Sequence, residues 1–365
     1  MRLFDLISIL LGASLFLTSC TSAPSRDKTG QGAPIEQAPI AALLATLSDE
    51  QRSSIVFPYD APIDVALSPT GEAYDKRIHM CSWWLASDRV VDSSGYTEEQ
   101  RGLIKEAVQR VSSPEGFRWL WPRLADQEVY SPRLALFGTP ASGSFEWVLT
   151  ARHITLRGGG ERGVFGGPLF YGERENVARE NPMNTRFLNV VSSATELFRS
   201  LTPEQQKRAL HATTSAEVVV PCGGDSKPGQ PDMFFGAHFD LSTSIGPSIA
   251  VAEFNSEQRE QFLRLIRQGL WLYSREQVDG KLADVARVIE RFRIAYYEKS
   301  PPPEVPRKWA EKLPGLLQES PTVLMADGER FYFSWRIEGP GLRWYYKGRS
   351  HVHSYLDGVN PDNRP

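Results

Sequence analysis

The stretch RFYFSWRIEGPGLRWYYKGRSHVHSY, residues 330–355, decides the fold class of this chain. Polar and apolar side chains alternate over residues 330–335, and two further segments rich in aromatic and β-branched residues follow at 342–346 and 350–355. Alternation and this composition are typical of strands. Residues 145–156 and 217–221 have the same character, so we expect a sheet built from segments spread along the chain.

Four segments have the sequence of a helix start: Ser48-Asp-Glu-Gln51, Thr97-Glu-Glu-Gln100, Thr202-Pro-Glu-Gln205 and Asn255-Ser-Glu-Gln258. In each, a Ser, Thr or Asn oxygen can accept a hydrogen bond from a backbone amide, and the Gln can reach back three residues, as in a capping box. The sequences downstream differ. We therefore interpret them as four helix starts and not as four copies of a repeat.

Amphipathic patterns follow these starts. The helix after Thr97 is expected to run to about Val111, and apolar residues lie on one helical face after Asn255. A second stripe begins near Lys281 and includes Tyr296, which predicts a helical hairpin joined near residues 279–280. Helices and strands come in mixed order without a regular βαβ rhythm. We expect an α+β fold, with one domain at residues 41–365 in which amphipathic helices flank an antiparallel-rich sheet.

Residues 1–40 are expected to lie outside that domain. Residues 1–19 combine Arg2 with an apolar run too short to span a bilayer, as in a secretory signal peptide. The run ends in Leu17-Thr-Ser-Cys20, which resembles the bacterial lipobox, whose cysteine receives lipid; an ordinary signal peptide with an incidental cysteine is the alternative. Residues 20–40 are expected to be a flexible tether. The resemblance implies a lipoprotein of the cell envelope, and Thr21 favours the outer membrane, facing the periplasm.

Charge and cysteine content restrict the partners. A formal net charge of −3 makes no electrostatic case for nucleic acid. If Cys20 carries lipid, Cys81 and Cys222 remain, and an oxidising periplasm permits a disulfide between them. Spacing in sequence does not reveal distance, so two free buried thiols are the alternative.

None of the common catalytic or cofactor-binding motifs considered predicts a function for this chain. Gly158, Gly160 and Gly163 fit G-x-G-x-x-G, but no helical periodicity follows them, so we interpret the stretch as a loop and not as a dinucleotide site. The sequence contains no G-x-S-x-G, H-E-x-x-H or C-x-x-C. Ordinary serine hydrolases, zincins and thioredoxins therefore have no motif support.

The six histidines are the remaining candidate ligands. His351 and His353 are two residues apart, which in a strand puts both on one face, where they could bind one transition metal ion. His238 and Asp240 have the same spacing in a stretch that is either strand or loop. His211 lies in a segment expected to be helical and solvent-facing.

Several motifs resemble, in order, those of a bacterial family catalogued as domain-of-unknown-function family number three thousand five hundred. They are Tyr96-Thr-Glu-Glu-Gln100, Ser112-Ser-Pro-Glu-Gly116, Phe137-Gly-Thr-Pro140 with Trp147, Ala151-Arg-His153, Pro168-Leu-Phe-Tyr-Gly172, Leu201-Thr-Pro-Glu-Gln205, Tyr345-Tyr346 with His351-Val-His353, and the tail from Asp357 to Asn363.

The resemblance implies a site in which histidines of a middle strand meet a late His-x-His. His153 would then join His351 and His353, with Asp357 or Asp362 as a further ligand. Arg152 stands where the family carries the first histidine of Gly-His-His. Arginine cannot bind a metal, and in a strand it would face away from His153. Residues expected to surround the ligands are Arg152, His238 and Asp240.

These observations favour a lipid-anchored periplasmic enzyme that uses one Zn, Cu or Fe ion for hydrolysis or oxidation. One alternative is a non-catalytic envelope lipoprotein that binds a ligand or a protein through late aromatic residues, unless these fill the core: Trp309, Trp335, Trp344, Tyr345 and Tyr346. The other alternative, motivated by Arg152, is a degenerate relative that has lost its metal.

Overall fold

A computed structural model describes residues 38–61, 89–126, 130–140, 144–159, 163–173, 187–213, 218–221, 235–238, 248–300, 320–321, 323–326, 329–332, 334–348 and 352–358. The predicted signal peptide, Cys20, most of the tether, Cys81, Cys222, Asp240, His351 and Asp362 lie outside these residues. Residues Ala33–Pro365 form one compact unit. None of the helices in the described ranges combines the length and the apolar character needed to cross a membrane.

A large sheet of twelve described strands organises this unit, which confirms the α+β prediction. Its order is β1 (Val56–Phe57), β2 (Arg133–Gly138), β3 (Phe145–Ala151), β4 (Ile154–Gly158), β5 (Pro168–Glu173), β16 (Val352–Asp357), β15 (Leu342–Lys347), β14 (Ser334–Gly339), β10 (Arg293–Ser300) and β11 (Ser320–Pro321). Strands β6 (Leu210–Thr213) and β9 (Ile249–Ala250) also pair with β10. The pairings are antiparallel except β1 with β2 and β6 with β10. Two separate ribbons join β7 (Val218–Pro221) to β8 (Phe235–His238) and β12 (Val323–Ala326) to β13 (Glu329–Tyr332).

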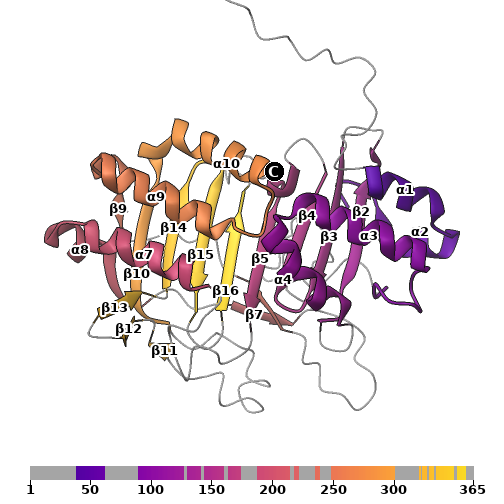
Figure 1. Ribbon diagram of the computed structural model, residues 1–365, viewed down its shortest axis with the longest axis horizontal. Helices are drawn as coiled ribbons and strands as arrows, with labels where there is room; N and C mark the ends of the chain where they lie inside the picture. Colours follow the sequence, from indigo (N-terminus) through magenta and orange to yellow (C-terminus); the bar gives the residue numbers. More distant parts are fainter. Residues whose placement is uncertain are drawn as a thin grey trace, which may run out of the picture. The chain divides into compact units, whose positions relative to one another are not determined.

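The helices cover one face of this sheet (Figure 1). They are α1 (Ala38–Thr46), α2 (Asp49–Ile55), α3 (Glu98–Val111), α4 (Pro114–Ala125), α7 (Leu188–Ser200), α8 (Pro203–Ala209), α9 (Ser256–Gly269) and α10 (Arg275–Arg287). The core between helices and sheet contains Trp147, Trp335 and Trp344, all fully buried. Packing is close, because a Cβ at Gly269 would stand 2.3 Å from the Trp344 ring. Larger residues are thereby excluded at that point of α9.

Two halves of the chain have the same architecture. The order α1–α2–β1–α3–α4–β2–β3–β4–β5 of the first half (38–173) returns as α7–α8–β6–α9–α10–β10–β14–β15–β16 in the second half (187–358), which has two insertions: β7, β8 and β9 after β6, and β11, β12 and β13 after β10. The strand order from β1 to β5 is mirrored from β6 to β16, and each half has one parallel pair, β1 with β2 and β6 with β10. Strands β5 and β16 meet antiparallel in the middle, where Leu169 lies opposite Leu356. The halves are therefore related by an approximate two-fold axis at this pair.

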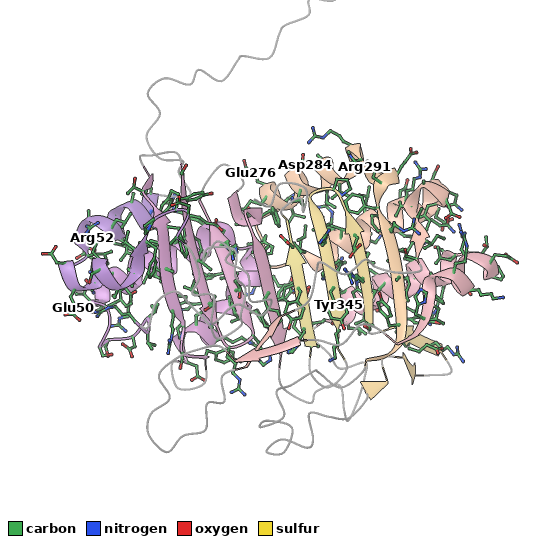
Figure 2. All side chains as sticks on the ribbon, turned by 180° about the vertical axis from the view of Figure 1, so that it is seen from behind. Glu50, Arg52, Glu276, Asp284, Arg291 and Tyr345 are labelled. Carbon is green, nitrogen blue, oxygen red and sulfur yellow. The ribbon has the colours of Figure 1, made fainter. Side chains whose placement is uncertain are left out.

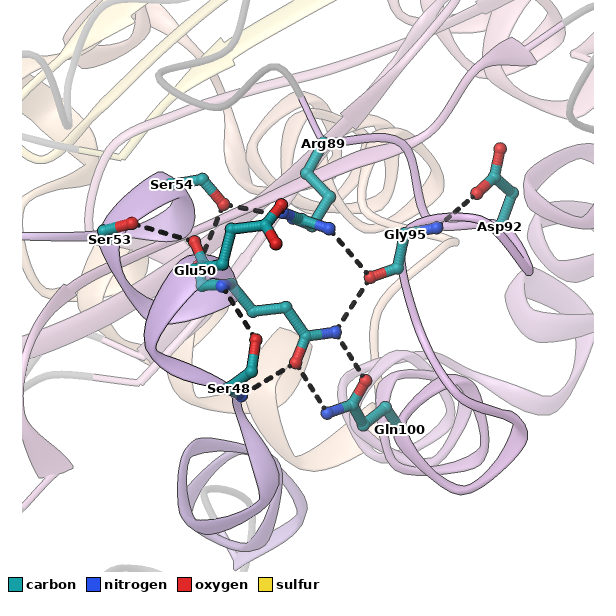
Figure 3. A network of polar contacts seen from close by, with 9 residues as sticks. Ser48, Glu50, Ser53, Ser54, Arg89, Asp92, Gly95 and Gln100 are labelled. Atoms are coloured by element: carbon teal, nitrogen blue, oxygen red, sulfur yellow. Dashed lines mark hydrogen bonds and ion pairs between the residues drawn. The ribbon is translucent and has the colours of Figure 1, made fainter.

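The four helix starts occupy equivalent places in the two halves. All four are capping boxes, as predicted. Gln51 of α2 is hydrogen-bonded to Gln100 of α3 (Figure 3), and Gln205 of α8 is hydrogen-bonded to Gln258 of α9. The interpretation as four helix starts is therefore confirmed. They are two copies of one pair, and the sequence did not reveal this because the residues downstream have diverged.

Four expectations need correction. Residues 279–280 lie inside α10, and Tyr296 lies in β10, so the helical hairpin turns at residues 270–274 instead. Residues 145–156 are not one strand but the hairpin β3–β4. His211 lies in β6 and is half-buried beside Tyr297, not on an exposed helix. In addition, α1 begins at Ala38, inside the predicted tether, because Pro39 and Ile40 are buried.

Candidate functional site

The sheet has a second face, directed away from the helices, which we call the polar face. Because side chains alternate along a strand, the neighbours of the core residues point to it. Figure 2 turns it toward the reader and labels Tyr345 on it. Its residues are Arg133, Glu146, Val148, Thr150, Thr155, Arg157, Phe170, His353, Tyr355, Asp357, Arg343, Tyr345, Lys347, Ser334, Arg336, Glu338 and Tyr297. Most are buried despite their polarity, and burial raises the pKa of Tyr297, so its phenol stays protonated.

His153 does not lie in a strand. With Arg152 it forms the two-residue turn between β3 and β4, where Ala151 pairs with Ile154. Its φ is +58°, a left-handed conformation that costs a non-glycine residue roughly 1–2 kcal/mol. Its carbonyl accepts a hydrogen bond from Gly172 N at 2.9 Å, and the Arg152 amide donates to the Tyr130 carbonyl at 3.0 Å. The expectation that Arg152 and His153 face opposite sides of a strand is therefore wrong.

The equivalent turn of the second half shows what the fold requires. Between β14 and β15 it is Pro340-Gly341, and Gly341 has a φ of +70°. Glycine adopts this conformation without a steric cost, and it is the residue that such turns prefer. His153 thus occupies a glycine position. The strain at His153 points to a role for its imidazole beyond folding.

The turn brings His153 against His353 of β16. Their ring centroids are 5.3 Å apart, and Phe170 lies 6.0 Å from His153 and 5.3 Å from His353. Two imidazoles that bind one ion tetrahedrally place their centroids roughly 5 Å apart, because metal–nitrogen bonds are about 2 Å long. The pair therefore has the spacing of two ligands of one metal.

Tyr355 supports this pair. Its hydroxyl lies 3.3 Å from Nδ1 of His353. The Tyr355 ring is stacked between Phe170, at 4.7 Å, and Tyr345, at 6.3 Å. A hydrogen bond to one ring nitrogen of a histidine fixes its tautomer and leaves the other nitrogen for a ligand. Nε2 of His353 can bind a metal when Nδ1 carries the proton and donates it to the Tyr355 hydroxyl.

Other predicted site residues are not brought to this pair. Asp357 lies four positions from His353 along β16, about 13 Å away. It is 2% exposed and lies opposite Arg343, so it does not share an ion with His353. His238 ends β8 in a separate ribbon. Within the described ranges, no group of three His, Cys, Asp or Glu side chains is arranged to hold a metal.

The late aromatic residues fill the interior. Trp335, Trp344, Tyr345 and Tyr346 are each 0% exposed, and Trp335 stacks on Tyr346 at 4.1 Å. They do not form an exposed binding surface. Trp309 lies outside the described residues.

Sequence reasoning missed the charged residues of the polar face. Arg157 Nη1 donates to Glu146 Oε1 at 2.8 Å, and the two side chains are only 0% and 2% exposed. Arg336 makes a second ion pair with Glu338. Glu146 and Thr150 are four residues apart, so in one strand both point to the same face, and this spacing could have indicated the polar face. Arg157 could not be placed on that face from the sequence, because it follows the turn at Arg152-His153.

Comparison with known proteins gives one result. Residues 31–306 match the model of a family described as "Protein of unknown function (DUF3500)". No curated protein and no solved structure matches the chain. The matched range includes His153 and ends before His353, so the similarity of the His-x-His ending rests on the motif alone. Because the match spans well over half of the chain, the protein belongs to the DUF3500 family, as its motifs had predicted.

Proposed function

We propose that this protein is a metal-dependent enzyme in which His153 and His353 bind one transition metal ion. The single observation that carries the proposal is that His153 occupies a strained turn position, filled by glycine in the equivalent hairpin, and faces His353 at 5.3 Å. We assign His351 as third ligand from the His-x-His sequence alone.

The chemistry depends on the ion. Imidazole ligands suit Zn, Cu and Fe. With three protein ligands and an open position, zinc would activate water for hydrolysis, whereas copper or iron would support oxidation. In either case His153 and His353 hold the ion, and Tyr355 orients His353.

The cellular location is also a proposal. The lipobox-like Leu17-Thr-Ser-Cys20 supports lipid attachment at Cys20 and a position at the outer membrane, facing the periplasm. Mass spectrometry of the protein from membranes tests this proposal. An acylated N-terminal Cys20 is expected, and an unmodified, released protein would contradict it.

Elemental analysis tests the metal site. Protein purified without chelator should contain about one equivalent of a transition metal, and His153→Asn and His353→Asn should each remove most of it. His211→Asn is the matched control, since His211 lies at the far edge of the sheet in β6. Less than about a tenth of an equivalent, with the same melting temperature in chelator, would contradict the proposal.

Arg152 motivates a second candidate function, that of a relative which has lost its metal. Arg152 shares the turn with His153, so a histidine there would stand beside the pair. If the wild type is metal-free and Arg152→His takes up metal, the second candidate holds. If neither protein takes up metal, both candidates fail and a non-catalytic lipoprotein is left.

A further inference from the structure

Gly172 of β5 lies between the two histidines in the sheet. It is opposite His353 on β16, and on its other side its amide donates a hydrogen bond to the His153 carbonyl at 2.9 Å. The three residues therefore form a row across β16, β5 and the β3–β4 turn. In the next row along the polar face, Phe170 of β5 stacks on Tyr355 of β16 at 4.7 Å. A side chain thus fills β5 beside Tyr355, but none does beside His353.

This row explains how the two imidazoles reach each other. Neighbouring strands are about 4.8 Å apart, so the backbones of His153 and His353 are separated by about 10 Å. Their ring centroids, however, are only 5.3 Å apart. The two rings therefore lean toward each other over the backbone of Gly172.

A Cβ at position 172 would meet two neighbours. It would stand 3.2 Å from Cδ2 of the His153 ring and 2.2 Å from the carbonyl oxygen of Val352. The first contact requires the imidazole to move, and the second requires the backbone of β5 or β16 to move. A glycine inside a strand often marks the close approach of another group to the backbone. At Gly172 two groups approach, one of them the ring of a proposed ligand.

We propose that Gly172 is the positioning residue of the histidine pair, because the absence of a side chain there sets the distance between the imidazoles of His153 and His353. Two nitrogens that bind one ion must each approach it to about 2 Å. A side chain at position 172 would push the His153 ring away from that arrangement. This role rests on the proposed function, since it serves the metal site, whereas the contact between position 172 and the His153 ring is present without a metal.

The first experiment tests the ring contact without metal. The full chain is treated with chelator, and melting temperatures are measured for the wild type, Gly172→Ala, His153→Gly and the double variant. His153→Gly removes the ring contact and leaves the Val352 contact. Gly172→Ala should therefore lower the melting temperature less in the His153→Gly background than in the wild type. Residues in contact show such non-additive effects, whereas the effects of independent positions add.

The losses in the two backgrounds decide between the His153 ring and the Val352 carbonyl. A smaller loss in the His153→Gly background, or a Gly172→Ala protein that folds only in that background, supports the positioning role. An equal or larger loss there, or failure to fold in both backgrounds, would overturn it. The backbone contact with Val352 would then be sufficient to explain the glycine.

The second experiment measures metal affinity by titrating zinc and cobalt(II) into the metal-free proteins. Gly172→Ala should weaken the affinity at least tenfold and change the visible absorption of bound cobalt. Gly116→Ala, in α4 on the other face of the sheet, is the matched control, because its Cβ would stand 2.2 Å from the Leu272 carbonyl oxygen. It should lower the melting temperature and leave the affinity and the cobalt spectrum unchanged.

The two experiments separate the two proposals. If the wild type binds neither ion, the proposed function fails, and the metal-free melting temperatures still decide whether position 172 controls the His153 ring. If the wild type binds metal and Gly172→Ala binds it with the same affinity, the proposed function holds and the positioning role is overturned.

Discussion

At the scale of single residues, the equivalent turns Arg152-His153 and Pro340-Gly341 can be compared directly. The fold requires a left-handed backbone at the second position of each turn, but it does not require a histidine there. Gly341 satisfies a left-handed backbone at no cost, whereas His153 does so at roughly 1–2 kcal/mol. Nothing lies within 4 Å of a Cβ built at Gly341, so a side chain there would meet only backbone strain. The residues at positions 153 and 341 can therefore be exchanged by mutation, and the effects on stability can be compared.

We expect Gly341→His to lower the free energy of unfolding by roughly 1–2 kcal/mol and to leave metal uptake unchanged. His153→Gly relieves the same strain but loses the ring packing against Phe170 and His353. Its stability should change by less than about 1 kcal/mol, while metal uptake falls. Chemical denaturation and elemental analysis measure both effects. A stable Gly341→His variant, or a His153→Gly variant that keeps its metal, would refute the interpretation of the turn.

At the scale of elements, the capping glutamines join helices as well as start them. Gln100 accepts from the Thr97 amide at 3.0 Å and donates to the Thr46 carbonyl at 2.9 Å. It is also hydrogen-bonded to Gln51, as Figure 3 shows. Gln258 repeats this pattern with the Asn255 amide at 3.0 Å, the Ser200 carbonyl at 2.7 Å and Gln205. Each glutamine thus holds a helix start against the end of an earlier helix.

Gln100→Ala and Gln258→Ala should each lower the free energy of unfolding by about 1–3 kcal/mol, because each leaves buried carbonyl and amide groups unpaired. The two losses should be similar, since the sites are equivalent. Gln109→Ala, on the exposed side of α3, is the control and should change stability by less than about 0.5 kcal/mol. A loss confined to one half would show that the two networks are not equivalent in energy.

At the scale of the whole molecule, the two halves share one sheet and one core. Strands β5 and β16 pair along six positions, from Val352 with Glu173 to Asp357 with Pro168. On the helix side, aromatic rings join the halves: Trp119 contacts Phe187 and Trp271, at 6.2 and 5.6 Å, and Tyr171 contacts Trp271 at 6.2 Å. The halves thus resemble two subunits joined by a connection.

A chain cut between Glu173 and Phe187 should therefore remain one particle. We expect a protease site inserted there to yield two fragments that co-elute in size-exclusion chromatography and separate only in denaturant. The paired strands and the aromatic contacts would hold the fragments together. Elution as two species under native conditions would show that the β5–β16 pairing and the aromatic contacts do not hold the two halves together.

The sequence by itself determined the local features of this protein. Capping boxes and amphipathic stripes depend only on residues close together in the sequence. The start of each of these helices and the α+β class could therefore be predicted. The same holds for the pairing of His153 with His353, which the family motif suggested before any geometry was known. The sequence could not show that residues 145–156 turn back at Arg152-His153, because a histidine occupies the position at which a glycine usually indicates a turn.

Only the tertiary structure decided the two-fold arrangement and the composition of the polar face. Strand order depends on contacts between segments more than a hundred residues apart, which leave no local pattern in a single sequence. Those contacts place β5 beside β16, so that Phe170 lies opposite Tyr355 on the polar face. A site on this sheet is defined by register across neighbouring strands, and register is set by packing of the whole sheet.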